Sequence, residues 1–286
     1  MTGKPRTPYE RRAPRSACDK LKGAAPPRVQ DHAVPAWGAE VVSSNIVGYE
    51  KVTLNPGFNM IGVQFVTVGD QSAQDLSTAT QLDSTMEGFD EDGNYATYIK
   101  VYEGGGNYTT YGWSGTSGEA YMEDATLNNK WLTSDYEEPE GETMDKGDAA
   151  WIIAGSSGTM TVAGEVPSAN TIEKSVAAGF NMVANPYPGT VTVADFGILD
   201  SSFAGFDEDG EYKNYLKVYV GGGNYKTFGW SGTSGTDYLE DPTLDNKWLN
   251  SDYEKTDDTV DFGHGVWLIT EKSGTITFTS PAAQGN

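Results

Sequence analysis

An internal duplication restricts the fold of this chain more than any other feature. Residues 88–136 and 205–253 are two copies of one segment, identical at 36 of 49 aligned positions without a gap. The shared text includes Phe-Asp-Glu-Asp-Gly, Gly-Gly-Gly-Asn-Tyr and Asn-Lys-Trp-Leu. A repeat of this length indicates that a whole structural unit was copied, so the chain must hold two similar folds.

The match between the copies extends beyond this segment on both sides. Gly-Phe-Asn-Met at 57–60 recurs at 179–182, and Ser-Gly-Thr at 157–159 recurs at 273–275. We therefore expect two β-domains, at residues 40–164 and 165–286. Each has the length of an ordinary domain, roughly 100–150 residues, and can bury its own core.

Residues 1–39 belong to neither copy and differ from them in composition. The first 36 residues hold eight Lys or Arg and three acids, whereas the rest holds eleven Lys, no Arg and 38 acids. This basic, Pro-rich leader lacks apolar periodicity, which predicts disorder. Ala36-Trp37-Gly38 has the form of a signal-peptidase site without a preceding apolar region, so we hypothesise a mis-assigned start and a mature protein beginning near Ala39.

The charge and the cysteine content exclude several classes of protein. The net charge of −22 argues against binding to nucleic acid or to anionic membrane surfaces, although the basic leader leaves a nucleic-acid arm as an alternative. No apolar run is long enough for membrane insertion as a helix. The single cysteine, Cys18, lies in the leader, so the repeats contain neither disulfides nor thiolate metal sites. We expect a secreted or cell-surface protein.

Short strands with regular turn signals predict an all-β fold. Residues 95–102 and 212–219 alternate in the period of a strand, and each is followed by Gly-Gly-Gly-Asn and a second strand, which predicts a hairpin. We expect two tandem homologous domains of the sandwich or barrel-like kind. The lead-in strand Ser43–Leu54 and the terminal strand Gly274–Thr279 are the expected free edges.

An acidic turn in each copy is a candidate calcium site. Phe-Asp-Glu-Asp-Gly places Asp90 and Asp92 in one copy, and Asp207 and Asp209 in the other, around a glycine. Calcium takes six to eight oxygen ligands, so such clusters suit it, but the spacing is not that of an EF-hand. An Asp-Gly hairpin turn explains the same residues without a metal. No other cofactor is expected.

The aromatic residues suggest a carbohydrate-binding surface. Tyr98 and Tyr102 share one strand face, as Tyr215 and Tyr219 do in the second copy, and Trp113 and Trp230 end the following strands. Rings stack on sugar C–H faces while acids and amides bind hydroxyl groups. The alternative is that the tyrosines pair across strands and the tryptophans fill the core.

A catalytic role has little support in the sequence. Gly-Trp-Ser-Gly departs from the Gly-x-Ser-x-Gly spacing of a nucleophile elbow, and the repeats contain one histidine, His264, which aligns with Asp148. A glycosidase acting through two carboxylates is the remaining enzymatic alternative. We expect no enzyme.

The unit opening resembles that of a known group of proteins. Val47-Gly48-Tyr49, Val52, Leu54 and Gly57-Phe58-Asn59-Met60-Ile61 form a pattern similar to the opening of uncharacterised exported tandem β-repeat proteins of environmental Gram-negative bacteria. The resemblance implies a secreted or surface β-domain and assigns no activity. The sequence therefore predicts a non-enzymatic exported structural or adhesive protein, self-assembling through strand edges or contacting surface and matrix components. A tandem carbohydrate-binding module, with glycans as partners, is the alternative.

Overall fold

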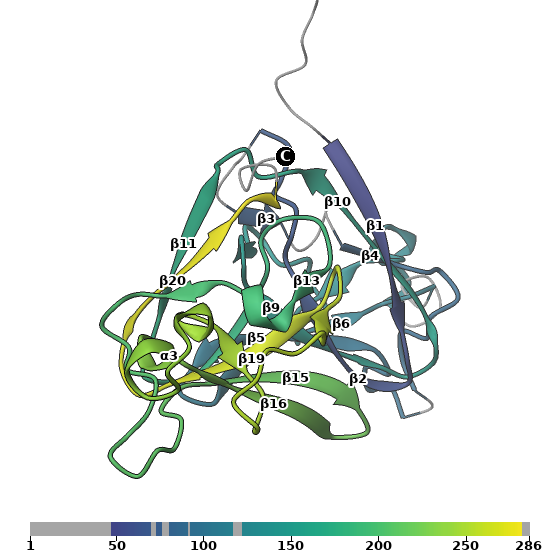
Figure 1. Ribbon diagram of the computed structural model, residues 1–286. Coiled ribbons are helices and arrows are strands. Elements are labelled where there is room, and N and C mark those ends of the chain that lie inside the picture. The colour runs from purple at the N-terminus through teal and green to yellow at the C-terminus, as the bar shows by residue number, and fades with distance from the viewer. Residues whose placement is uncertain (1–46, 70–72, 76–79, 91, 117–121, 282–286) are drawn as a thin grey trace, which may run out of the picture. The chain divides into compact units, whose positions relative to one another are not determined.

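The computed structural model describes residues 47–69, 73–75, 80–90, 92–116 and 122–281 (Figure 1). Chain contacts separate Met1–Val42 from Ser43–Asn286, and all the described residues of both repeats belong to the second unit. The predicted leader and its cleavage site lie outside the described residues. None of the helices within these ranges has the length and hydropathy needed to cross a membrane.

Both repeats consist almost entirely of short strands. The first contains β1 (Val47–Leu54), β2 (Gly57–Gly62), β3 (Ala73–Asp75), β4 (Thr80–Leu82), β5 (Tyr98–Gly104), β6 (Asn107–Trp113), the 3-10 turn η1 (Ala125–Leu127), β7 (Trp131–Leu132), β8 (Thr143–Asp145), β9 (Ala149–Ala154) and β10 (Gly158–Glu165). The second contains β11 (Thr171–Val176), β12 (Gly179–Ala184), β13 (Val191–Thr192), η2 (Val193–Asp195), β14 (Ile198–Leu199), β15 (Tyr215–Gly221), β16 (Asn224–Trp230), α3 (Ser234–Asp237), η3 (Pro242–Leu244), β17 (Trp248–Leu249), β18 (Thr259–Val260), β19 (Gly265–Thr270) and β20 (Gly274–Thr279).

The two repeats have the same sheet topology, as the duplication requires. The first forms a five-stranded sheet in the order β2-β9-β5-β6-β7, a three-stranded sheet in the order β1-β10-β4, and the pair β3-β8. The second repeats this arrangement as β12-β19-β15-β16-β17, β11-β20-β14 and β13-β18. Figure 1 shows the paired strands β1 and β10 on one side of this unit and β11 and β20 on the other.

Each repeat encloses its own apolar core between its two larger sheets. In the first, Leu54 and Met160 from the three-stranded sheet pack with Ile99 and Ile152 from the five-stranded sheet. The second core is built in the same way and is separate from the first. Two cores, each between facing sheets, confirm the all-β fold with two homologous sandwich-like units.

The predicted hairpins form because glycine permits their turns. Gly104, Gly105 and Gly106 all have positive φ, from 60° to 90°, and the ladder between β5 and β6 shifts register between Tyr102 and Gly104. Residues with a Cβ rarely adopt this conformation, which explains why the three glycines occur in both copies. The strand begins at Tyr98 rather than at Tyr95, because Tyr95 instead forms an isolated bridge with Phe89.

One predicted sheet edge is correct and one is wrong. β1 lies at the edge of its sheet, but β20 lies between β11 and β14, so the terminal strand is not free. The edge equivalent to β1 is β11. The boundary between the repeats was expected after residue 164, but Glu165 is still part of β10 and pairs with Val47. The first repeat therefore extends to at least Glu165.

Candidate functional site

The two repeats contact each other through equivalent residues. The Gly62 N–H donates to the Gly263 carbonyl at 2.9 Å, and the Ala184 N–H donates to the Gly147 carbonyl at 2.9 Å. In the alignment of the copies, 62 corresponds to 184 and 147 to 263. Each repeat therefore gives and receives the same contact. This is the pattern of a two-fold symmetric dimer interface, here within one chain.

Aromatic rings continue this reciprocal contact. Tyr102 packs edge-on against Trp267 with ring centres 5.2 Å apart, and the equivalent Tyr219 packs against Trp151 at 5.1 Å. The same tryptophans also contact Phe180 and Phe58, at 5.6 and 5.5 Å. The two tryptophans belong to a third apolar cluster, together with Met60, Ala149, Met182 and Ala184. The outer faces of the five-stranded sheets thus bury part of their aromatic surface against each other.

The predicted tyrosine faces are therefore divided between two environments. Tyr102 and Tyr219 belong to the contact between the repeats. Tyr98 is half-buried beside Lys100, whose Nζ lies 5.8 Å from its ring centre, and Tyr215 packs against Tyr212. The four tyrosines do not form one continuous exposed ledge.

The assignment of Trp113 and Trp230 to a binding surface is wrong. Their exposed fractions are 0% and 1%, and each packs against another buried tryptophan, Trp131 or Trp248, in the core of its own repeat. The final residue of β6 or β16 points between the two sheets, opposite to the face that carries the tyrosines. These rings stabilise the sandwich and offer no surface to a sugar.

The acidic turns place their carboxylates within local hydrogen-bond networks. Asp90 Oδ1 accepts the N–H groups of Asp92 and Asn94 at 3.0 and 2.8 Å, and Asp207 Oδ1 makes the same two bonds in the second repeat. The Asn94 backbone bond is the main cause that lowers the pKa of Asp90. Throughout the described ranges, no three His, Cys, Asp or Glu side chains gather as a metal site would require. A calcium role for Asp90, Asp92, Asp207 and Asp209 stays a prediction.

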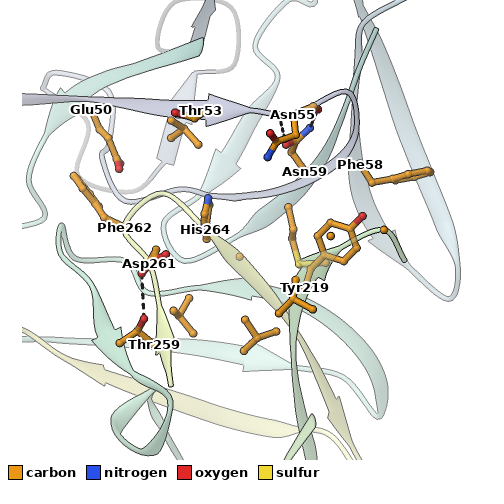
Figure 2. Close-up of a pocket in the computed structure, with 18 of the residues that line it drawn as sticks. Glu50, Thr53, Asn55, Phe58, Asn59, Tyr219, Thr259, Asp261, Phe262 and His264 are labelled. Carbon is orange, nitrogen blue, oxygen red and sulfur yellow. Dashed lines mark hydrogen bonds between the residues drawn. The ribbon is translucent and has the colours of Figure 1, made fainter. Parts of the chain in front are cut away.

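A cleft that we call the Glu50 cleft opens where the repeats meet. Its volume is about 600 Å³. β1, β2 and the corner between them form one wall, and β15, β18 and the start of β19 form the other. Figure 2 shows Glu50 and Phe58 from the first repeat together with Tyr219, Asp261, Phe262 and His264 from the second.

Glu50 is the most unusual group in this cleft. The burial pattern of β1 alternates, so Glu50 is half-buried while its neighbours Tyr49 and Lys51 are exposed. In the described part of the chain, its carboxyl group has no hydrogen bond or ion pair. Burial without a partner raises the pKa of Glu50 to about 7.

A second cleft, the Lys174 cleft, lies at the equivalent place on the other side of the interface. Its volume is about 1000 Å³, and its walls include Tyr108, Phe180 and Trp267. Lys174 Nζ forms an ion pair with Asp148 Oδ1, and the Asp145 N–H donates to Asp148 Oδ2 at 2.8 Å. Burial raises the pKa of Asp148, and the Lys174 ammonium opposes that rise.

Three substitutions between the copies distinguish the clefts. Val52 stands where Lys174 stands, since each pairs with the equivalent residue of β10 or β20. His264 stands in place of Asp148, and Glu50 in place of Ile172. Partial desolvation of the imidazole by the surrounding protein lowers the pKa of His264, and the negative charge of Asp261 opposes this shift. The Glu50 cleft therefore has an acid but lacks the internal ammonium of its counterpart.

The sequence alone does not reveal this cleft, although the alignment of the copies shows His264 in place of Asp148. The signal lay in the differences between the copies at 50, 52 and 264. Positions that change polarity on an otherwise retained scaffold deserve comparison, but only the packed structure shows that these three lie together.

Comparisons with known proteins leave the function open. No protein-family model matches the chain, and no curated protein matches it. One solved structure, described as the crystal structure of the STIV MCP, is 13% identical over a match that covers 82% of this chain and 93% of that one. Its TM-score of 0.23 is too low to support any inference.

Proposed function

We propose that the protein is an exported, non-enzymatic structural protein whose copies associate through the edges of their three-stranded sheets. The observation that carries this proposal is the exposed edge of β1, which has no second strand partner in the described ranges. Beside that edge, Tyr49 and Val47 are 73% and 62% exposed. Unpaired backbone groups next to apolar side chains favour the addition of another strand.

The second repeat supplies a complementary edge. β11 is also unpaired on its outer side in the described structure, and its exposed positions are Thr171, Glu173 and Ser175. β1 presents Lys51 and Thr53 as well as its apolar residues. If β1 of one copy pairs with β11 of the next, the contact is head-to-tail and does not close, which produces a filament or layer.

The proposal of a non-catalytic role rests on the chemistry of the clefts. Glu50 and His264 line one cleft, but within the described structure they form no hydrogen bond with each other. A general base normally needs a hydrogen-bonded partner that orients it. The Lys174 cleft holds an ion pair in which both charges are already matched.

Light scattering and electron microscopy of the full chain test the assembly. We expect growth of particles with concentration, promoted by salt because the repeats are strongly acidic. Val47→Lys with Tyr49→Lys should abolish growth, whereas Val68→Lys, at an equally exposed turn position, should not. A chain that stays monomeric at all concentrations and salt levels, or that assembles equally with the β1 variant, would overturn the proposal.

A carbohydrate-binding role is the second candidate, and the Lys174 cleft favours it. Phe180 is 54% exposed and lies beside Trp267, while Glu103 and Ser175 line the same cleft with polar groups. Such a wall suits a sugar ring. A glycan array with Phe180→Ala and Tyr102→Ala variants tests it, with Phe58→Ala in the other cleft as the matched control. Binding that ignores Phe180 and Tyr102 would remove this candidate.

A further inference from the structure

We propose that the Glu50 cleft binds an alkylammonium group, carried by a lysine side chain or by a small diamine, with Glu50 as its counter-ion. This inference is independent of self-assembly. It rests on the shape and chemistry of the Glu50 cleft and on the ion pair that the Lys174 cleft contains.

The first argument is the unmatched carboxyl group. Glu50 is half-buried and has no hydrogen bond or ion pair in the described structure. A carboxylate removed from water without a partner is costly, and a bound cation would restore its favourable environment. The carboxylate lies against the backbone of Gly263, where an added Cβ would be 3.0 Å from Glu50 Oε2. It is therefore directed toward the opposite repeat rather than into bulk solvent.

The second argument is the Lys174 cleft, which already contains such a cation. There, the Lys174 ammonium reaches from β11 across the interface to Asp148. In the Glu50 cleft the equivalent of Lys174 is Val52, so no internal lysine takes that role. The two clefts have the same scaffold. An external ammonium in the Glu50 cleft would therefore occupy the region that the Lys174 ammonium occupies in the Lys174 cleft.

The lining of the cleft suits an alkylammonium better than a metal ion. Phe58, Met60 and Phe262 provide apolar and aromatic contacts for a methylene chain. Ring faces of Phe58 and Tyr219 also attract cations. Asp261 adds a second carboxylate, held by the Thr259 hydroxyl at 3.1 Å. A hydrated divalent ion would require more oxygen ligands and fewer apolar walls.

The titratable and charged groups of the cleft set the pH range for binding. They are Glu50, Lys51, Tyr219, Asp261 and His264. Lys51 is exposed on the outer face of β1, so it does not neutralise Glu50 directly. Glu50 must be ionised to hold the cation, and its pKa near 7 means that binding should strengthen from pH 5.5 to pH 8.5.

Isothermal titration calorimetry of the full chain tests the proposal. The probes are cadaverine and Nα-acetyl-lysine methylamide, with pentanoate as an analogue of opposite charge. We expect saturable binding of at least one amine at pH 8.5, at least tenfold weaker at pH 5.5, and no binding of pentanoate. A preference for the lysine derivative would point to a protein partner, and a preference for cadaverine to a free amine.

Glu50→Gln should weaken amine binding at least tenfold, and Asp261→Asn should weaken it less. Glu173→Gln on the exposed face of β11 is the matched control and should leave binding unchanged. Thermal melting verifies that each variant is folded. Failure of both amines to bind, equal binding by wild type and Glu50→Gln, or displacement of the amine by micromolar Ca²⁺ would each overturn the proposal.

Discussion

The two sides of the interface between the repeats began as one sequence and now differ in chemistry. On one side, Lys174 and Asp148 form an ion pair across the contact. On the other, Val52 and His264 occupy those positions, and Glu50 has no partner in the described structure. The sheets, hairpins and cores are the same on both sides. A duplicated contact can therefore diverge in charge while the fold persists, because the cores carry most of the stability and the clefts little of it.

A close contact between the repeats at Gly62 gives the largest expected effect. A Cβ added to Gly62 would lie 2.4 Å from the Cβ of its equivalent, Ala184, and 2.9 Å from the His264 carbonyl oxygen. Gly62→Ala should therefore cost about 3 kcal/mol of unfolding free energy through overpacking. Urea denaturation measures this loss.

A compensating variant sharpens the test. Adding Ala184→Gly to Gly62→Ala removes the nearest clash and should recover part of the loss, whereas Ala184→Gly alone should cost about 1 kcal/mol. No loss in the Gly62 variant, or no recovery in the double variant, would contradict the reciprocal packing described above.

Removing the cation from the Lys174 cleft has the next largest effect. Lys174→Met leaves Asp148 without its counter-ion in a partly buried place, and we expect a loss of about 2 kcal/mol at pH 7. The loss should shrink at low pH, where Asp148 becomes protonated. Denaturation at pH 7 and pH 4 measures both values.

An exposed ion pair provides the control for this change. Lys226 pairs with Asp258, but its side chain is 54% exposed. Lys226→Met should cost at most about 0.5 kcal/mol. Equal losses in the two lysine variants would mean that the Lys174 pair is no more important than a surface contact.

Removing the acid from the Glu50 cleft should raise the stability of the protein, whereas the changes above lower it. The pKa of Glu50 is raised from 4.5 to about 7, so the folded state binds more protons than the unfolded state between these values, and stability falls as pH rises through this window. Glu50→Gln should raise stability at pH 8 by about 1 kcal/mol, after a discount for the solvent access of the group, and leave it unchanged at pH 4. His264 is present in both proteins, so its own titration cancels. The same gain at both pH values would contradict an effect of ionisation.

The smallest net effect is expected when two of the three differing positions of the Glu50 cleft are changed to the residues of the Lys174 cleft. Val52→Lys with His264→Asp places the Lys174–Asp148 pair in the Glu50 cleft. Because the scaffold already accommodates this pair, we expect stability within about 1 kcal/mol of wild type and complete loss of amine binding. Val52→Lys alone should be less stable than the double variant. If the two variants are equally stable, the clefts are not equivalent in geometry.

Much of the fold was predictable because it depends on local patterns. Alternating residues around Gly104–Gly106 predict the β5–β6 hairpin, and the second copy repeats the pattern at β15–β16. The free edge at β1 was also predictable. The edge assigned to the terminal strand was wrong, because the two residues of β14 that cover part of β20 give too short a signal to recognise.

The site residues were less predictable because strand alternation does not say which face will be covered. Tyr102 and Tyr219 do lie on an outer sheet face, but the other repeat covers that face. Trp113 and Trp230 fill the core, which the sequence allows only as an alternative, since the position of a residue at the end of a strand does not show whether it points into the sandwich.

By itself, the sequence determined that this protein has two copies of one β-fold, with glycine turns and apolar cores in each. Those features depend on local backbone preferences and on the period of side-chain burial, which a single copy already contains. Only the tertiary structure decided how the copies meet, that Lys174 pairs with Asp148, and that Glu50 lies in a cleft with His264 and has no partner among the described residues. The physical reason is that desolvation and charge pairing depend on neighbours that are far apart in the sequence.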